Sequence, residues 1–166
     1  MGTKFSTRIW VSVVGIASIF FGSKGYADTV ISVADFGLKP DTRENAVAYV
    51  QKAIEACRGK EPVTLVFPEG RYDFWPQYAH EKNYYETNTY DVFPKRLAML
   101  FEGFHNITVD GNGSQFVMHD RIQPITVENC DGVTLKNFSI DWDIPLTAQA
   151  RVIKVGSDFF EIEINV

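Results

Sequence analysis

The sequence is poor in the features that mark several common protein classes. It has only two cysteines in 166 residues and no surplus of basic residues, since 16 Lys and Arg stand against 21 Asp and Glu. The net charge of −5 argues against nucleic acid and against an anionic membrane as partners. Of its residues, 45% are hydrophobic and 14% are aromatic, which suits one globular unit with a sizeable core.

The two cysteines, Cys57 and Cys130, both fall at apolar positions of their local patterns. Export from the cell would permit a disulfide between them, but apolar surroundings favour two buried free thiols. Metal-ligand spacing is also missing, because residues 110–113 (Asp-Gly-Asn-Gly) lack the further spaced oxygens of a calcium loop and are better explained as a tight turn. We therefore expect no metal and no cofactor.

No apolar run is long enough for a comfortable membrane span of about 20 residues. Two basic residues precede an apolar run over residues 9–22, and residues 25–27 (Gly-Tyr-Ala) offer the small residues of a cleavage site. We predict that residues 1–27 are a signal peptide cleaved between Ala27 and Asp28, with an uncleaved anchor as the alternative. The mature protein would then be secreted or periplasmic, free of the membrane, with a net charge of −8, which fits a neutral substrate better than a polyanion.

Residues 99–142 can be aligned with themselves at an offset of 26 residues. The coinciding apolar pairs are Met99/Ile125, Phe101/Val127, Phe104/Cys130, Ile107/Val133 and Val109/Leu135, and the corner pairs are Gly103/Asn129 and Gly111/Asn137. Each copy is typical of two short strands around a bend. Such a period favours a stacked β-solenoid, whereas a β-sandwich or meander is the alternative.

Before the repeats, the pattern predicts strands over residues 30–33, 63–67 and 71–75, with a helix between the first two. Asp41 is the expected N-cap of this helix, and Glu44 would complete a capping box. The apolar positions of the helix form one stripe, so we expect it to cover the open end of the first coil.

Residues 76–94 are polar and aromatic with little periodicity, which is typical of a functional loop. The aromatic residues in and before it could stack on sugar faces or simply pack the loop onto the body; they are Trp75, Tyr78, Tyr84, Tyr85 and Tyr90. Two further strands are predicted over 148–155 and 159–166. Because no polar element caps the stack, residues 28–166 are expected to be the N-terminal part of a longer domain.

Three motifs carry a resemblance to a known fold. They are Val-Ala-Asp-Phe-Gly at 33–37, Val-Gln-Lys-Ala-Ile at 50–54 and Val-Phe-Pro-Glu-Gly-Arg-Tyr at 66–72. In this order they resemble the N-terminal segment of the pectate-lyase-like proteins. The resemblance implies an all-β fold, a right-handed parallel β-helix with an N-terminal capping α-helix, of which this chain contains the first coils.

Finer motifs point to one family. They are Arg-Tyr-Asp-Phe-Trp-Pro at 71–76, His-Asn-Ile-Thr-Val-Asp-Gly-Asn-Gly at 105–113 and Phe-Ser-Ile-Asp-Trp-Asp-Ile-Pro at 138–145. With the Tyr- and Asn-rich loop they resemble glycoside hydrolase family 110, whose members are secreted bacterial α-1,3-galactosidases. The resemblance implies inverting hydrolysis of terminal α-1,3-linked galactose, as in blood group B glycans, with a carbohydrate as partner.

Inverting glycosidases place two carboxyl groups about 6.5–9.5 Å apart. The resemblance implies that the catalytic aspartates of the family lie on later coils, so no catalytic residue is assigned and the fragment alone is expected to be inactive. The candidates that exist are Asp141 and Asp143, which would share one face of a strand with Cα atoms about 6.5–7 Å apart, unless they are turn residues. Trp142, His119 and Asp120 are candidate substrate-binding residues, although His119 and Asp120 also fit a solvated loop.

Two other functions stay open at this point. A polyuronate lyase or polygalacturonase of the same fold should carry a basic groove, with calcium in the lyases, and the acidic net charge leans against it. A non-catalytic carbohydrate-binding β-helix module would lack convergent carboxylates.

Overall fold

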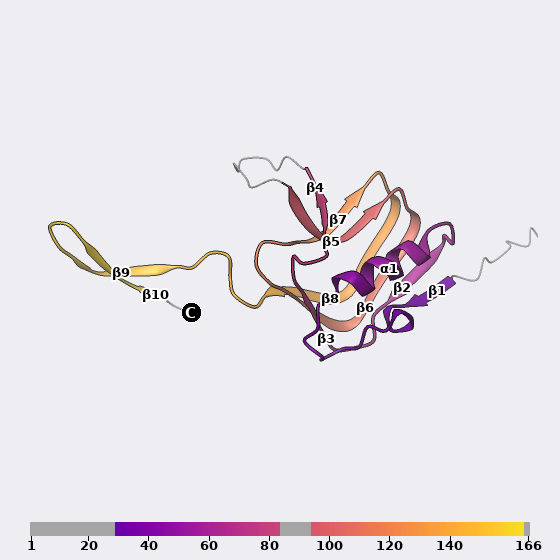
Figure 1. The fold of residues 1–166 in the computed structure, drawn as a ribbon, viewed down its shortest axis with the longest axis horizontal. Helices are drawn as coiled ribbons and strands as arrows, with labels where there is room; N and C mark the ends of the chain where they lie inside the picture. Colours follow the sequence, from indigo (N-terminus) through magenta and orange to yellow (C-terminus); the bar gives the residue numbers. More distant parts are fainter. Residues whose placement is uncertain (1–28, 84–93, 165–166) are drawn as a thin grey trace, which may run out of the picture.

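The computed structural model describes residues 29–83 and 94–164, and strands dominate it (Figure 1). The elements are β1 (Thr29–Ser32), the 3-10 helix η1 (Val33–Phe36), α1 (Val47–Cys57), β2 (Val63–Val66), β3 (Arg71–Phe74), β4 (His80–Lys82), β5 (Lys95–Glu102), β6 (His105–Met118), β7 (Gln123–Glu128), β8 (Asp131–Trp142), β9 (Ala150–Val155) and β10 (Phe160–Ile164). Within these described ranges, neither helix is long and apolar enough to cross a membrane. The predicted signal peptide and its cleavage site lie outside the described residues.

The internal repeat predicted at an offset of 26 residues is confirmed by the strand register. β5 pairs in parallel with β7, which places Met99 beside Ile125, and β6 pairs in parallel with β8, which places Ile107 beside Val133. The apolar side chains of paired strands therefore lie next to one another, as expected when each copy covers the inward residues of the next.

Three more strands extend this arrangement toward the N-terminus. One sheet has the order β1, β2, β6, with β3 and β8 also pairing with β6, and all of these pairs are parallel. A second sheet has the order β4, β5, β7, in which β4 pairs with β5 in the antiparallel direction. The fold is thus mostly β with parallel sheets, and strands that are far apart in the chain lie side by side.

The register along β6 and β8 changes once, at a corner. Asp110 lies beside Lys136, at the offset of 26, whereas Ser114 lies beside Phe138, at an offset of 24. β6 therefore carries two more residues at this corner than β8 does, and the strands regain their pairing on both sides of it.

The other corners are set by residues with a left-handed backbone. Gly103 and Asn129, which the repeat pairs, both have positive φ, at 71° and 51°. The corner equivalence of Gly111 with Asn137 is only partly right: Asn137 is left-handed, but at this corner of β6 the left-handed residues are Asn112 and the glycine after it. The two extra residues of β6 shift the bend along the chain.

The helix α1 begins later than the sequence predicted, and the capping box from Asp41 and Glu44 is wrong. Asp41 is itself left-handed, and its carboxylate accepts a hydrogen bond of 2.9 Å from the backbone N–H of Arg71. The first helical N–H, that of Val47, instead donates to Asn45 Oδ1 at 3.1 Å. The carboxylate of Asp41 therefore binds β3, and the side chain of Asn45, nearer the helix, accepts the hydrogen bond from the first turn of α1.

The core is shared by α1 and the strands. The buried stripe of α1 comprises Val47, Val50, Ala53, Ile54 and Cys57. It belongs to the same cluster as the inward residues of β2, β3, β5 and β6. Aromatic rings fill the centre, where Phe116 contacts Phe67, Tyr72, Phe74 and Phe138 with centroids 4.8–6.2 Å apart.

Both cysteines are free thiols. Cys57 is fully buried, as predicted, and its thiol lies 3.2 Å from the carbonyl oxygen of Ala53. Cys130 is half-buried rather than buried, with its sulfur 3.3 Å from the carbonyl oxygen of Phe101.

The antiparallel hairpin of β9 and β10 projects away from the rest of the structure (Figure 1). Its register places Val155 beside Phe160, Val152 beside Ile162 and Ala150 beside Ile164. Phe160, Ile162 and Ile164 alternate along β10 and therefore share one face. The register shifts between Glu161 and Ile162, so Ile153 is an extra residue in β9 and the partners Val155, Val152 and Ala150 stay on the same face, while Arg151, Lys154, Glu161 and Glu163 lie on the other. All of the residues of both strands are exposed.

Candidate functional site

An aromatic ring, an imidazole and a carboxylate lie side by side at the ends of β3, β6 and β8. Trp75, His119 and Asp143 each follow the last residue of one of these strands, and those last residues are paired in register. The ladder continues one step further, because the N–H of His119 donates to Phe74 O at 2.9 Å and that of Asp143 to Met118 O at 3.0 Å. The three residues are therefore stacked neighbours although they are far apart in the sequence.

Asp73 is the buried anchor of this region. Its side chain has no exposure, and it accepts hydrogen bonds from Arg71 Nη2 at 2.6 Å, from Arg71 Nε at 3.0 Å and from His119 Nε2 at 2.8 Å. Burial alone would raise the pKa of Asp73, but the hydrogen bonds and charges of Arg71 and His119 outweigh it and hold the pKa below its usual range. Asp73 is therefore an ionised carboxylate that binds both Arg71 and His119.

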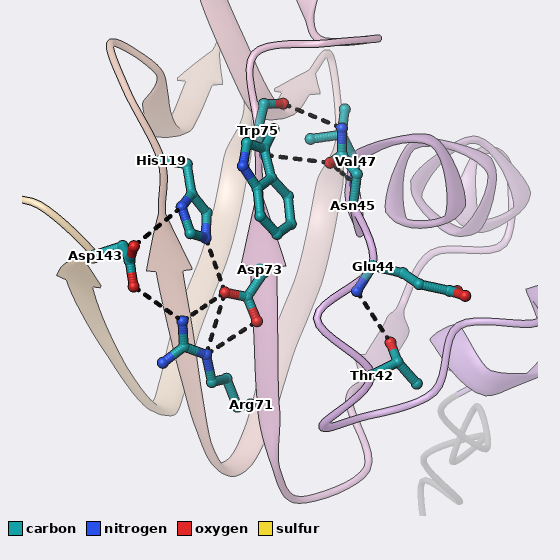
Figure 2. A network of polar contacts seen from close by, with 9 residues as sticks. All are labelled: Thr42, Glu44, Asn45, Val47, Arg71, Asp73, Trp75, His119 and Asp143. Carbon is teal, nitrogen blue, oxygen red and sulfur yellow. Dashed lines mark hydrogen bonds and ion pairs between the residues drawn. The ribbon is translucent and has the colours of Figure 1, made fainter.

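His119 is fixed in orientation from two directions. Its ring stacks on Trp75 with centroids 3.8 Å apart and an angle of 4° between the planes. Because Nε2 faces Asp73, the other ring nitrogen, Nδ1, faces Asp143, with Oδ2 of that residue 3.7 Å away (Figure 2). The same stack covers one face of Trp75, so that face is not open to a sugar.

Asp143 is the outermost member of the cluster. Its side chain is 44% exposed, and its Oδ1 lies 3.4 Å from Arg71 Nη2. Both of its contacts are longer than the 2.7–2.9 Å that is typical of a strong charged hydrogen bond. Arg71 thus lies between a buried and an exposed carboxylate, which it binds tightly and loosely, respectively.

The loop before α1 holds the far side of this cluster. Asn45 Oδ1 accepts from the backbone N–H of Trp75 at 3.2 Å as well as from that of Val47 (Figure 2). Asn45 Nδ2 donates to Gln77 O at 2.8 Å. The backbone N–H of Ala46 also donates to Asp73 O at 2.8 Å. One amide side chain therefore ties the start of the helix to the end of β3.

Three curated proteins that are similar to this chain are all named alpha-1,3-galactosidases. The protein called alpha-1,3-galactosidase B from Bacteroides thetaiotaomicron is 61% identical over 139 residues, which are 84% of this chain and 23% of its own length. This chain belongs to glycoside hydrolase family 110. Alpha-1,3-galactosidase A from Shewanella woodyi is 38% identical over 82% of the chain and 22% of its own length, and an alpha-1,3-galactosidase B from Phocaeicola vulgatus is 35% identical over 93% and 25%.

The family 110 chain spans about a quarter of the length of these curated relatives. A scan of the chain against models of protein families finds no match.

Two of the five residues singled out from the family 110 sequence meet in this cluster, namely His119 and Asp143. Asp141 does not join it: its Oδ1 accepts a hydrogen bond of 2.8 Å from the N–H of Trp142, directly beside it. The ring of Trp142 packs against the core, and its Nε1 is buried without a hydrogen-bond partner among the described residues. Asp120 lies at a left-handed turn and its carbonyl accepts from Ile122 N.

The sequence analysis missed Arg71 and Asp73 as site residues. The signal was present in the alternation of β3, where Tyr72 and Phe74 point into the core, so that Arg71 and Asp73 must lie on the outer side. What the pattern did not reveal is that Asp73, on the outer side, is completely covered. The covering residues come from β6 and from the loop before α1, both distant in sequence.

No group of three or more His, Cys, Asp or Glu side chains within residues 29–83 and 94–164 is placed to hold a metal ion. The described aromatic members of the predicted sugar-stacking set are Trp75, which stacks on His119, and Tyr78, which is exposed. Tyr84, Tyr85 and Tyr90 lie outside the described residues.

Proposed function

We propose that the polypeptide containing this chain is a secreted, inverting α-galactosidase that removes terminal α-1,3-linked galactose from glycans. The observation that carries the proposal is the identity of 61% over 84% of the chain with a protein named alpha-1,3-galactosidase B. The export signal read from residues 1–27 supports secretion.

The fold that we propose for this part is the first coils of a right-handed parallel β-helix, with α1 as the cap. The parallel pairing at an offset of 26 residues supports it, since such pairing between successive copies is what a coil stacked on a coil requires. The single core shared by α1 and the inward strand residues supports the capping role of the helix.

The cluster at Asp143 favours a neutral sugar over a uronic acid. Its charged side chains are one guanidinium and two carboxylates, with the second carboxylate exposed. An exposed carboxylate repels the carboxylate of a uronate, whereas it accepts hydrogen bonds from sugar hydroxyls. The chemistry of this cluster therefore supports the galactosidase against the polyuronate enzyme.

The test is hydrolysis of an aryl α-galactoside by the full-length polypeptide and by the chain of 166 residues, with the anomer of the released galactose followed by NMR. We expect β-galactose from the full-length polypeptide and no release by the chain alone. Depolymerisation of a polyuronate without any release of galactose would overturn the proposed function.

A further inference from the structure

We propose that Asp143 and Arg71 form a binding site for two neighbouring hydroxyl groups of the galactoside, and that Asp73 and His119 are the residues that position them. The proposal rests on the proposed function for the identity of the sugar. The site itself rests on the geometry at the ends of β3, β6 and β8.

The carboxylate of Asp143 can accept more hydrogen bonds than it does. Asp73 is fully covered and accepts hydrogen bonds of 2.6–3.1 Å from three nitrogens, Arg71 Nε, Arg71 Nη2 and His119 Nε2. Asp143 is 44% exposed, and its side-chain contacts with the described residues are the two long ones to Arg71 and His119, at 3.4 Å and 3.7 Å. A carboxylate has about four lone-pair positions, so Asp143 can accept from hydroxyl groups on its open side while its neighbours keep its orientation.

Arg71 supplies the matching donor. Its Nε and Nη2 bind Asp73, and Nη2 also faces Asp143, whereas its third nitrogen, Nη1, has no hydrogen-bond partner in the described part of the chain. Figure 2 shows this third nitrogen on the side of the guanidinium away from Asp73. A hydroxyl both donates and accepts, so one can donate to Asp143 and accept from Arg71, while its neighbour on the sugar uses the second carboxylate oxygen.

The charges select among possible ligands. The side chains of Arg71, Asp73 and Asp143 carry one positive and two negative charges, and this excess of negative charge disfavours an anion such as phosphate or uronate. A metal cation is disfavoured as well, because the guanidinium of Arg71 already lies between the two carboxylates. A neutral polyhydroxy compound is the class that fits both restrictions.

The positioning residues explain why the site would be rigid. Asp73 holds the Arg71 fork through two nitrogens and fixes which nitrogen of His119 faces Asp143. The ring of His119 is clamped by its stack on Trp75. A site whose polar groups are held in advance loses less conformational entropy on binding.

The test uses the full-length polypeptide, with galactose as ligand in calorimetry and an aryl α-galactoside as substrate. The variant is Asp143→Asn, and the matched control is Asp131→Asn, which removes the same charge at the exposed start of β8, the strand that Asp143 follows. We expect Asp143→Asn to weaken galactose binding and raise KM about 10- to 100-fold, as for loss of a charged hydrogen-bond acceptor. The control should bind as the unchanged protein does.

His119→Gln tests the positioning role separately. Gln can still donate to Asp73 but lacks the flat ring that stacks on Trp75, so it should raise KM more than it lowers kcat. Trp fluorescence should change in this variant at the same time, since Trp75 loses its stacked neighbour.

The outcomes separate the two proposals. If the unchanged polypeptide releases galactose but Asp143→Asn binds galactose with unaltered affinity and KM, the binding site is wrong and the proposed function stands. If the unchanged polypeptide neither hydrolyses the substrate nor binds galactose, the proposed function fails and the site fails with it. Melting temperatures of all variants identify any that lose binding by unfolding, and in that case Asp143→Glu, which keeps the charge, should restore the melting temperature and part of the binding if the site is right.

Discussion

Replacing Asp73 by Asn should destabilise the protein strongly, because it removes the charge that Arg71 and His119 both contact. The Asp73 side chain is fully buried, and the side chains of Arg71 and His119 are 22% and 14% exposed. Breaking a buried ion pair on one side typically costs about 3–5 kcal/mol in the free energy of unfolding. Arg71 keeps some water and a second partner in Asp143, so we expect about 2–3 kcal/mol here.

The measurement is urea unfolding of Asp73→Asn against the unchanged protein, with the exposed Asp131→Asn as control. A loss of this size should lower the melting temperature by about 4–12 °C in a chain of this length. The control should stay within about 0.5 kcal/mol, as for most surface substitutions.

The pH dependence provides a second check on the same variant. The pKa of Asp73 is lowered in the folded protein because the hydrogen bonds and charges of Arg71 and His119 outweigh the effect of burial. A lowered pKa contributes stability that is present above the unfolded pKa of about 3.9 and is lost as the pH falls through the folded pKa. The difference between the unchanged protein and Asp73→Asn should therefore be full at neutral pH and shrink below about pH 4. A difference under about 0.5 kcal/mol at neutral pH, or one that does not shrink in acid, would refute this account of Asp73.

Three further predictions concern the backbone, a thiol and the hairpin. Gly70→Ala should cost at least about 2 kcal/mol in urea unfolding, since φ is 144° and an added Cβ would lie 2.5 Å from Pro40 Cβ; Gly103→Ala, which meets nothing within 4 Å, should cost only about 1 kcal/mol. Burial raises the pKa of Cys57 to about 11, so iodoacetamide should modify Cys130 before Cys57 in the folded protein at pH 8, and equal rates would contradict the burial of Cys57. Phe160→Ser should lower the fluorescence of a hydrophobic dye bound to the protein, whereas Glu161→Ser on the opposite face of the hairpin should not; an equal response would argue against the apolar face.

The repeat was predictable from sequence because it is periodic and local. A slip of one residue would turn every inward side chain of a strand outward, so matching apolar positions at an offset of 26 fix the pairing of β5 with β7 and of β6 with β8 as far as Asp110. The change of offset at Asp110 could not be predicted, because it depends on how many residues each corner uses and not on the alternation of the strands.

The site could be predicted only in part. His119 and Asp143 stand out as polar residues at the ends of apolar strands, and the structure places them together. From its place in the strand alone, Asp73 is an outward residue that should be exposed. Its burial could not be predicted, because it depends on contacts with β6 and with the loop before α1, which are distant in the sequence. The N-cap was misplaced for a similar reason: Asp41 has the right chemistry for a cap, but its carboxylate is used by β3, across a gap of 30 residues.

The corner where β6 and β8 differ in length has a consequence for how sequences of this kind can diverge. Two residues more or fewer are absorbed there, and the strands on both sides still pair with their apolar residues facing the core. Insertions and deletions at this position therefore leave the packing intact, while a single residue added within a strand would turn the side chains beyond it to the opposite face. Among relatives, gaps in alignment should gather at this corner, and a loop grafted between Asp110 and Ser114 should leave the fold unchanged.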